Sequence, residues 1–263
     1  MANEIVKIHN DLTNEKLGKM NAKELDLFMT ICHKMRDKGT AKVSISFEDL
    51  RKLGNYSATS NKVLAKELIS ANSKLLEFQI IIVNGKKTKQ RTLFKEFETD
   101  EEALIVNCEV WEETAYILND LASHFTRFEL SEFVSLESKY AKRLYKIVKQ
   151  YKTQGKFYMS KDNLYKALDI PKSLHRACNF NDRALNPALK ECKKYIPSLE
   201  CIPKKGGRGG AIKGYNFTFS AEIPPAPKSV SKQKIMTKNK FNEFEQKQDY
   251  DMQNLERQIL SNN

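Results

Sequence analysis

Residues 43–54 read Val-Ser-Ile-Ser-Phe-Glu-Asp-Leu-Arg-Lys-Leu-Gly, which joins a short strand to a capped helix. Val43 to Ser46 alternates apolar and polar residues, as a half-buried strand does. Ser46 can cap a helix over 47–53, and Gly54 with Asn55 predicts the end of that helix. A strand, a two-turn helix and a tight turn in this order are typical of the centre of a helix-turn-helix unit.

The flanking segments complete the unit. Asn21 can cap a preceding helix, because Glu24 lies three residues further on and apolar residues follow at helical spacing. The expected elements are a helix over 21–35, the strand and helix described above, a second helix over 57–71, and β-rich runs over 75–83 and 88–97 around the turn Asn84-Gly85. Helix, strand, helix, tight turn, helix and hairpin is the order of a winged helix-turn-helix.

The same order returns in the second half of the chain. The expected elements there are a helix over 130–151, a strand over 156–159, helices over 161–168 and 181–195, and strands over 198–202 and 214–219. The sequence therefore predicts an α+β fold with two tandem winged helix-turn-helix domains and a flexible C-terminal tail. We expect an N-terminal winged-helix domain over 1–120, a C-terminal winged-helix domain over 121–222, and a linker with an interaction tail over 223–263.

The positive charge of the chain is concentrated in one segment. The 263 residues include 45 Lys and Arg against 33 Asp and Glu, a formal +12, yet residues 139–213 alone hold 19 basic and five acidic side chains. Such a segment is typical of a protein that binds a polyanion. Nucleic acid is the first candidate partner and anionic lipid is the second. A solvated basic surface without a partner is the alternative. On the helix over 130–151, cations occupy the sides away from the apolar stripe: Lys139, Lys142, Arg143, Lys146 and Lys149.

The helix over 181–195 is the strongest candidate for DNA recognition. Its apolar residues Leu185, Leu189, Cys192 and Ile196 share one face, which leaves the opposite face polar and basic. The outward residues are Arg183, Asn186, Lys190, Lys193 and Lys194. Arg and Asn can form bidentate hydrogen bonds with guanine and adenine edges, whereas Lys mainly contacts phosphate. A solvated basic face is the alternative. Pro187 either starts the regular helix or kinks it after a looser first turn.

A glycine-rich basic loop lies between the last two strands, where a wing belongs. Lys204, Lys205 and Arg208 can neutralise phosphates, and the glycines allow close approach of the backbone. The loop lacks the motif and the context of a nucleotide-binding loop. A hairpin tip without a ligand is the alternative.

The first domain offers a smaller set of candidates for DNA contact. Ser60, Asn61 and Lys62 begin its second helix, and Lys87 belongs to the basic hairpin segment 86–91. Because residues 1–138 carry a net negative charge, we expect weaker contact here, directed at the DNA backbone. A surface for protein contact, including dimerisation, is the equal alternative.

No catalytic, metal or cofactor site is expected. The four histidines are isolated, the five cysteines show no metal-ligand spacing, and the acidic residues over 96–113 are expected to form a solvated connector between the domains. Without an apolar run that could span a membrane or a leader segment, we expect a cytoplasmic protein that does not contact membranes. The apolar residues over 241–260, beyond a polar linker, are expected either to bind a partner or to pack on their own domain.

Several of these segments resemble one known family. The stretch Ser138-Lys-Tyr-Ala-Lys-Arg-Leu-Tyr145, the stretch Leu185-Asn-Pro-Ala-Leu-Lys-Glu191, the wing Lys205-Gly-Gly-Arg208 and the strand Tyr215-Asn-Phe-Thr-Phe219 are similar to initiator replication proteins of theta-replicating iteron plasmids. The resemblance covers about residues 5–220. It implies two winged-helix domains in one chain, with the recognition helix at Arg183, Asn186, Lys190 and Lys194 and the wing at Lys204, Lys205 and Arg208. Cys192-Lys193 departs from the residues that the family often has at that point.

The resemblance also implies a function. Members bind directly repeated double-stranded DNA as monomers, many repress their own promoter as homodimers, and they recruit the host replication initiator and the replicative helicase. We therefore expect a non-enzymatic plasmid initiator that promotes origin opening. A winged-helix transcriptional regulator without a replication role is the alternative, and a nuclease or nickase is a third hypothesis.

Overall fold

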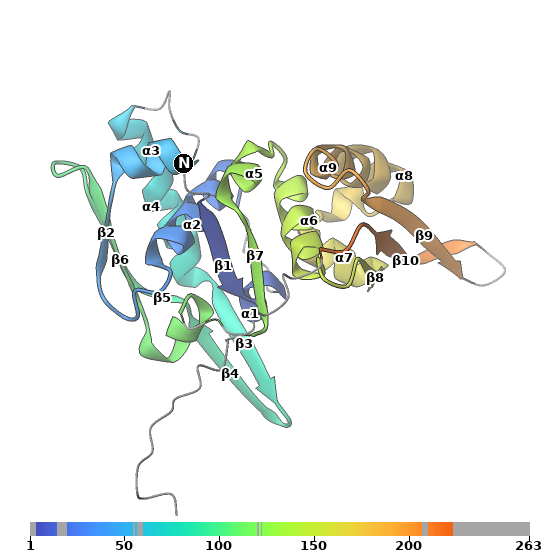
Figure 1. Ribbon diagram of the computed structural model, residues 1–263, viewed down its shortest axis with the longest axis horizontal. Coiled ribbons are helices and arrows are strands. Elements are labelled where there is room, and N and C mark those ends of the chain that lie inside the picture. The colour runs from blue at the N-terminus through green and yellow to red at the C-terminus, as the bar shows by residue number, and fades with distance from the viewer. Residues whose placement is uncertain are drawn as a thin grey trace, which may run out of the picture. The chain divides into compact units, whose positions relative to one another are not determined.

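The computed structural model describes residues 4–14, 20–54, 56, 60–119, 121, 123–206 and 210–222 of the chain (Figure 1). The tail expected over 223–263 lies outside the described residues. The first half contains β1 (Ile5–His9), α1 (Asn10–Asn14), α2 (Ala22–Met35), β2 (Val43–Ser46), α3 (Phe47–Gly54), α4 (Asn61–Glu77), β3 (Gln79–Asn84), β4 (Lys87–Thr92), β5 (Phe94–Asp100), β6 (Ile105–Val110) and the 3₁₀ turn η1 (Glu112–Ile117).

The helix-turn-helix of the first domain consists of α2, α3 and α4. Asn21 and Glu24 form a reciprocal capping box at the start of α2, in which the Glu24 amide donates to Asn21 Oδ1 at 2.9 Å. Ser46 Oγ accepts from the Asp49 amide at 3.0 Å and caps α3 as expected. Both predicted caps are confirmed.

Helix α4 is displaced toward the C-terminus relative to the prediction. It begins after the Ser60 cap and ends at Glu77, so that the following strand starts at Gln79 rather than at Leu75. Residues 57–59, where the predicted helix begins, lie outside the described residues. Leu75 stays helical because it continues the buried stripe of Leu64, Leu68 and Ala71.

The segment that we expected to connect the domains is part of the first domain. β5 pairs with β6, and β6 pairs with β2, to form an antiparallel sheet in the order β2-β6-β5. Val106, Cys108 and Val110 alternate inward from β6 into the core, and this alternation stabilises the sheet despite the acidic residues on its other face. The expectation of a solvated connector is wrong. β3 and β4 form a separate two-stranded hairpin, the wing of this domain.

Strand β1 pairs with β7 (Phe125–Glu129), which lies 120 residues further along the chain. The antiparallel register joins Ile5 to Glu129 and His9 to Phe125 (Figure 1). The sheet therefore crosses the domain boundary that we expected between residues 120 and 121, and that position is no break in the packing.

The second half completes the fold with a further set of elements. These are α5 (Leu130–Ser135), α6 (Lys139–Gln150), β8 (Lys156–Ser160), α7 (Lys161–Leu168), the 3₁₀ turn η2 (Lys172–Leu174), α8 (Ala177–Phe180), the π-helical turn η3 (Asn181–Leu185), α9 (Asn186–Cys192), β9 (Glu200–Gly206) and β10 (Ala211–Thr218). The helix expected over 130–151 is thus divided, because the backbone leaves the helical region at Leu136 and Ser138. Ser138 then caps α6, its Oγ accepting from the Tyr140 amide at 3.1 Å.

The second winged-helix domain is built on the sheet β8-β10-β9. Its inner face carries Phe157, Tyr215 and Phe217, which pack among the helices. Ser160 caps α7, and Asp169 ends it in the left-handed conformation at φ 54°. The fold is α+β with two winged-helix domains, as predicted. The hairpins β3–β4 and β9–β10 project beyond the helices of their domains (Figure 1).

The recognition segment is one helical run, α8-η3-α9, with a π turn inside it. Pro187 has no N–H to donate to the carbonyl of Arg183, and its ring would clash with that carbonyl in a regular helix. The wider turn over Asn181–Leu185 removes the clash, and Pro187 then occupies the first turn of α9. Of the two alternatives for Pro187, the first is observed, because Pro187 stands in the first turn of the regular helix α9, directly after the π turn.

The hydrophobic core extends through both halves of the described chain. It includes Cys32, Cys108 and Cys192, which are buried free thiols. In the described part of the chain, no helix is long and apolar enough to cross a membrane.

Candidate nucleic-acid interface

The predicted separation of apolar and polar residues holds in part. Leu185 and Cys192 are buried, whereas Leu189 and Ile196 are half-buried; Ala184 and Ala188 are buried as well. All five outward candidates are solvent-exposed: Arg183, Asn186, Lys190, Lys193 and Lys194. Arg183, Asn186 and Lys190 lie on the α8-η3-α9 run, and Lys193 and Lys194 lie in the turn that follows Cys192.

The wing places further cations on the same domain. Lys204 and Lys205 are exposed on β9, and Lys204 Nζ lies 5.1 Å from the centre of the Tyr158 ring. Tyr158 and Ile202 are both about half exposed and flank Asn216 across the sheet. Arg208 lies outside the described residues. Tyr158 was not among the predicted candidates, although an aromatic residue at an outward strand position beside a basic wing is a visible signal.

Helix α9 is anchored to the corner between α5 and α6. Glu191 Oε2 accepts hydrogen bonds from the backbone amides of Glu137 at 2.7 Å and Ser138 at 3.2 Å. Ser135 and Tyr195 share a hydrogen bond between their hydroxyls, and Cys192 Sγ donates to the Ala141 carbonyl at 3.4 Å. These contacts hold the exposed face of α9 in a fixed orientation.

Three of the cations expected on the surface of α6 are buried. Lys142, Arg143 and Lys146 are 1%, 4% and 3% exposed, so they add nothing to the surface facing a polyanion. Lys142 Nζ lies 2.6 Å from Asp26 Oδ1 and also donates to the Phe133 carbonyl. The expectation that they are outward is wrong because α2 and α1 cover Lys142 and Lys146, and the end of α7 covers Arg143.

The other two buried cations contact backbone carbonyls. Arg143 donates to the Leu168 carbonyl at 3.0 Å and lies 3.1 Å from the carboxylate of Asp169, at the end of α7. Lys146 Nζ donates to the carbonyl of Leu12 at 3.3 Å. Burial, followed by the nearby charge of Arg143, lowers the pKa of Lys146 to about 7.

Asp26 and Lys142 form an ion pair that is almost completely removed from water. Burial raises the pKa of Asp26 to about 7, although the charge of Lys142 and its hydrogen bond act in the opposite direction. Burial likewise lowers the pKa of Lys142, and Asp26 partly restores it. A buried pair of this kind depends on both partners being present.

The candidates of the first domain are exposed but sparse. Ser60, Asn61, Lys62 and Lys87 are all open to solvent. Ser60 Oγ accepts from the Val63 amide at 3.4 Å, and Asn61 Oδ1 accepts from Arg51, so both side chains already have partners. The exposed surface of α4 and β3 also includes four large apolar side chains, since Val63, Ile69, Leu76 and Ile81 are 39–49% exposed. This surface is less suited to base recognition than that of α9.

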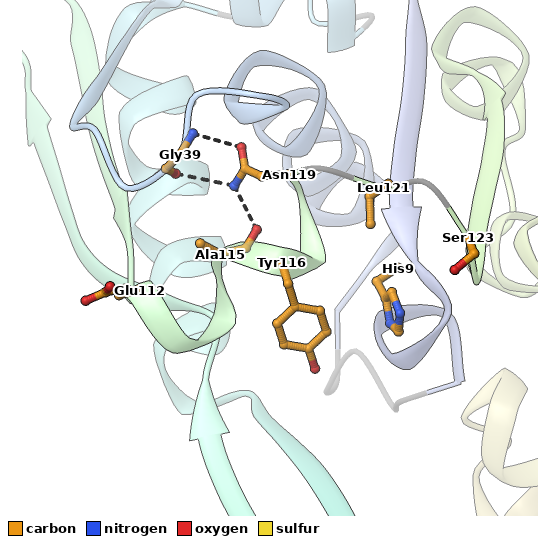
Figure 2. A pocket seen from close by; sticks show the side chains of 8 residues that line it. All are labelled: His9, Gly39, Glu112, Ala115, Tyr116, Asn119, Leu121 and Ser123. Atoms are coloured by element: carbon orange, nitrogen blue, oxygen red, sulfur yellow. Dashed lines mark hydrogen bonds between the residues drawn. The ribbon is translucent and has the colours of Figure 1, made fainter. Parts of the chain in front are cut away.

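A pocket of about 460 Å³ with both polar and apolar lining lies elsewhere on the first domain (Figure 2). Asn119 Oδ1 accepts from the Gly39 amide at 2.8 Å, and Asn119 Nδ2 donates to the Ala115 carbonyl at 2.7 Å. The pocket is lined by His9, Gly39, Glu112, Ala115, Tyr116, Asn119, Leu121 and Ser123. Asn119 thus joins the loop at Gly39 to η1. None of the predicted site residues line this pocket. Among the described residues, no group of His, Cys, Asp and Glu is arranged to hold a metal ion.

Comparison with known proteins agrees with this architecture. The family model described as "Initiator Replication protein, WH1" matches residues 5–149, and "Initiator Rep protein, WH2" matches residues 160–219. A probable replication protein of Bifidobacterium longum is 39% identical over 227 residues, which cover 86% of this chain and 75% of that protein. The crystal structure of the Pi initiator protein in complex with iteron DNA aligns with a TM-score of 0.66 at 14% identity, covering 85% of this chain and all of that chain.

The two matched segments meet between residues 149 and 160, after α6. The order of elements, the two wings and the match over both segments lead to one conclusion: the chain belongs to the initiator replication protein family.

Proposed function

We propose that this protein initiates plasmid replication by binding directly repeated double-stranded DNA, the iterons of an origin. The proposal is carried by the exposed residues Arg183, Asn186 and Lys190 on a helical run whose other side is buried, followed by Lys193 and Lys194 in the turn after it. A similar fold, that of the Pi initiator, is known in complex with iteron DNA. The family membership supports the assignment to replication.

The α8-η3-α9 run would enter the major groove. Arg183 and Asn186 would contact base edges, because their side chains form bidentate hydrogen bonds with guanine and adenine. Lys190, Lys193 and Lys194 would neutralise phosphates, and Lys204 and Lys205 of the wing would contact the neighbouring backbone, joined by Arg208. Asn186 lies at the start of α9, where recognition helices contact bases.

The first domain would bind the DNA backbone through Ser60, Asn61, Lys62 and Lys87. With the two domains in successive major grooves, one copy would cover about two helical turns, roughly 20 bp. The protein would bind each repeat as a monomer. The exposed apolar side chains of α4 and β3 support a further role of the first domain in protein contact, including formation of a homodimer.

Initiation would follow from several copies bound side by side. Bending flexible DNA steps costs a few kcal/mol, which many phosphate contacts can offset, so that an adjacent A·T-rich segment would open. The bound copies would then recruit the host replication initiator and the replicative helicase. We propose that the protein acts by binding rather than by catalysis.

Footprinting of the full chain on the DNA that flanks its gene tests the proposal. We expect several protected segments of about 20 bp in direct repeat. A single protected inverted repeat would favour a transcriptional regulator instead. Metal-dependent cleavage of supercoiled plasmid by the pure protein would show instead that it is a nuclease or nickase.

A further inference from the structure

We propose that Glu191 is a positioning residue that fixes the distance and rotation of the recognition helix relative to the first domain, so that the protein measures the spacing between the two halves of its DNA site. This inference rests on the proposed DNA binding through both domains. It adds a residue that contacts no DNA yet determines which arrangement of half-sites is bound.

Glu191 links α9 to the start of α6. Glu191 Oε2 accepts from the amides of Glu137 and Ser138, the residues that lead into α6. Amides at the start of a helix have no acceptor within the helix, and the helix dipole favours a negative charge there. Here the acceptor comes from the recognition helix. One carboxylate therefore joins the orientations of the two helices.

Helix α6 is in turn linked to α2 and α1, near the start of the chain. One turn after Ser138, Lys142 Nζ reaches Asp26 Oδ1 of α2 at 2.6 Å and the Phe133 carbonyl at 2.9 Å. One turn further, Lys146 donates to the carbonyl of Leu12 in α1. Lys142 and Lys146 lie on the 12-residue helix α6, and Ser138 is its N-cap, so α6 connects the anchor of α9 to α2 and α1.

The connection between the two domains affects which spacing of DNA half-sites the protein can bind. Each base pair advances B-DNA by about 3.4 Å and rotates it by about 34–36°. A protein with rigidly connected domains cannot follow one inserted base pair without losing the contacts of one half-site. Tyr195 and Cys192 also contact the α5–α6 corner, so loss of the Glu191 hydrogen bonds would loosen this junction rather than release it. A looser junction would let α9 follow the rotated half-site in part, and the insertion would cost less affinity.

The experiment compares the affinity of the full chain for its natural repeat with the affinity for the same repeat carrying one inserted base pair between the two half-sites. For the wild type we expect the insertion to weaken binding at least about tenfold, or about 1.4 kcal/mol. For Glu191→Ala we expect a loss below about threefold. Glu191→Gln keeps an oxygen that can accept from both amides and should restore most of the discrimination.

Glu137→Ala is the matched control, because it removes the same charge from an exposed neighbouring side chain and leaves the Glu137 amide in place. The ratio of two affinities cancels effects of net charge and of the folded fraction, so a structural role alone would not change it. If Glu191→Ala keeps the discrimination of the wild type, or if Glu137→Ala loses it equally, the inference is wrong. Absence of specific binding by the wild type to the natural repeat would instead contradict the proposed function.

Discussion

Lys142 donates a hydrogen bond of 2.6 Å to Asp26, although the two residues lie 116 positions apart. The lysine is 1% exposed and Asp26 is 6% exposed, so the pair is removed from water. It joins α6 to α2 and belongs to the polar face of an amphipathic helix. The polar face of α6 contacts polar groups of other elements rather than solvent. In this respect α6 differs from an ordinary surface helix.

Replacing Lys142 by Met should strongly destabilise the protein. The substitution leaves the Asp26 carboxylate buried without its cation and removes the donor to the Phe133 carbonyl, which should cost about 3–5 kcal/mol. Urea unfolding at pH 7 measures the change. The double variant Asp26→Leu with Lys142→Met should recover most of the loss, since neither charge then remains. Equal losses in the single and double variants would show that the ion pair is not their source.

Stability should rise with pH above 7 because of Lys146. Its pKa in the folded protein is lowered to about 7, whereas an unfolded lysine titrates near 10.4. Between these values the unfolded chain binds more protons, so raising the pH favours the folded state by up to about 1.4 kcal/mol per pH unit. Lys146→Met should therefore be more stable than the wild type at pH 7 and show a smaller rise toward pH 10. The exposed Lys166→Met is the control and should follow the wild type.

Arg183 and Lys205 should affect DNA binding in different ways. Arg183→Ala should reduce the preference for the repeat over random DNA by about 1–3 kcal/mol, because it removes a group that can read a base. Lys205→Ala should weaken binding to all DNA similarly and reduce the salt dependence by about one phosphate contact. Titrations of both DNAs at several salt concentrations separate the two effects. Unchanged affinity and salt dependence in both variants would remove this face from the interface.

Pro187→Ala should alter the geometry of the recognition helix. Alanine supplies the N–H that Pro187 lacks, so the π turn over Asn181–Leu185 can relax to a regular helix. Each residue of an α-helix turns it by about 100°, and Arg183 would then rotate relative to Lys190. We expect the preference for the repeat to fall while binding to random DNA is kept. Pro197→Ala, which changes an exposed proline beyond the helix, should leave the preference unchanged.

The sequence predicted the local structure well where the signal lay within one element. The caps at Asn21 and Ser46 follow from residue type and spacing, as does the burial of Leu185 and Cys192, and the structure confirms them. Periodicity also identified the polar face of α6 correctly. It could not show that α1 and α2 cover Lys142 and Lys146 on this face, because that contact depends on residues more than 100 positions away.

The other differences between prediction and structure also arise from contacts between segments that are distant in the sequence. Acidic residues made the region of β5 and β6 look like a connector, whereas its alternating apolar residues complete a sheet with β2. Glu191 belongs to a motif that is visible in the sequence, but its partners are backbone amides, which carry no side-chain signal. The contribution of each proposed DNA-contacting residue stays a prediction.

The pairing of β1 with β7 limits how this protein can be divided or recombined. A fragment ending at residue 120 would separate the two strands and leave Val6 and Ile8, both fully buried, without their cover. Chimeras between related initiators should instead be joined in the turn over 151–155, after α6. The joint should keep Gly155, whose φ is +68° and whose position allows no side chain beside the Phe219 carbonyl. The first and last parts of the N-terminal domain must therefore come from the same parent.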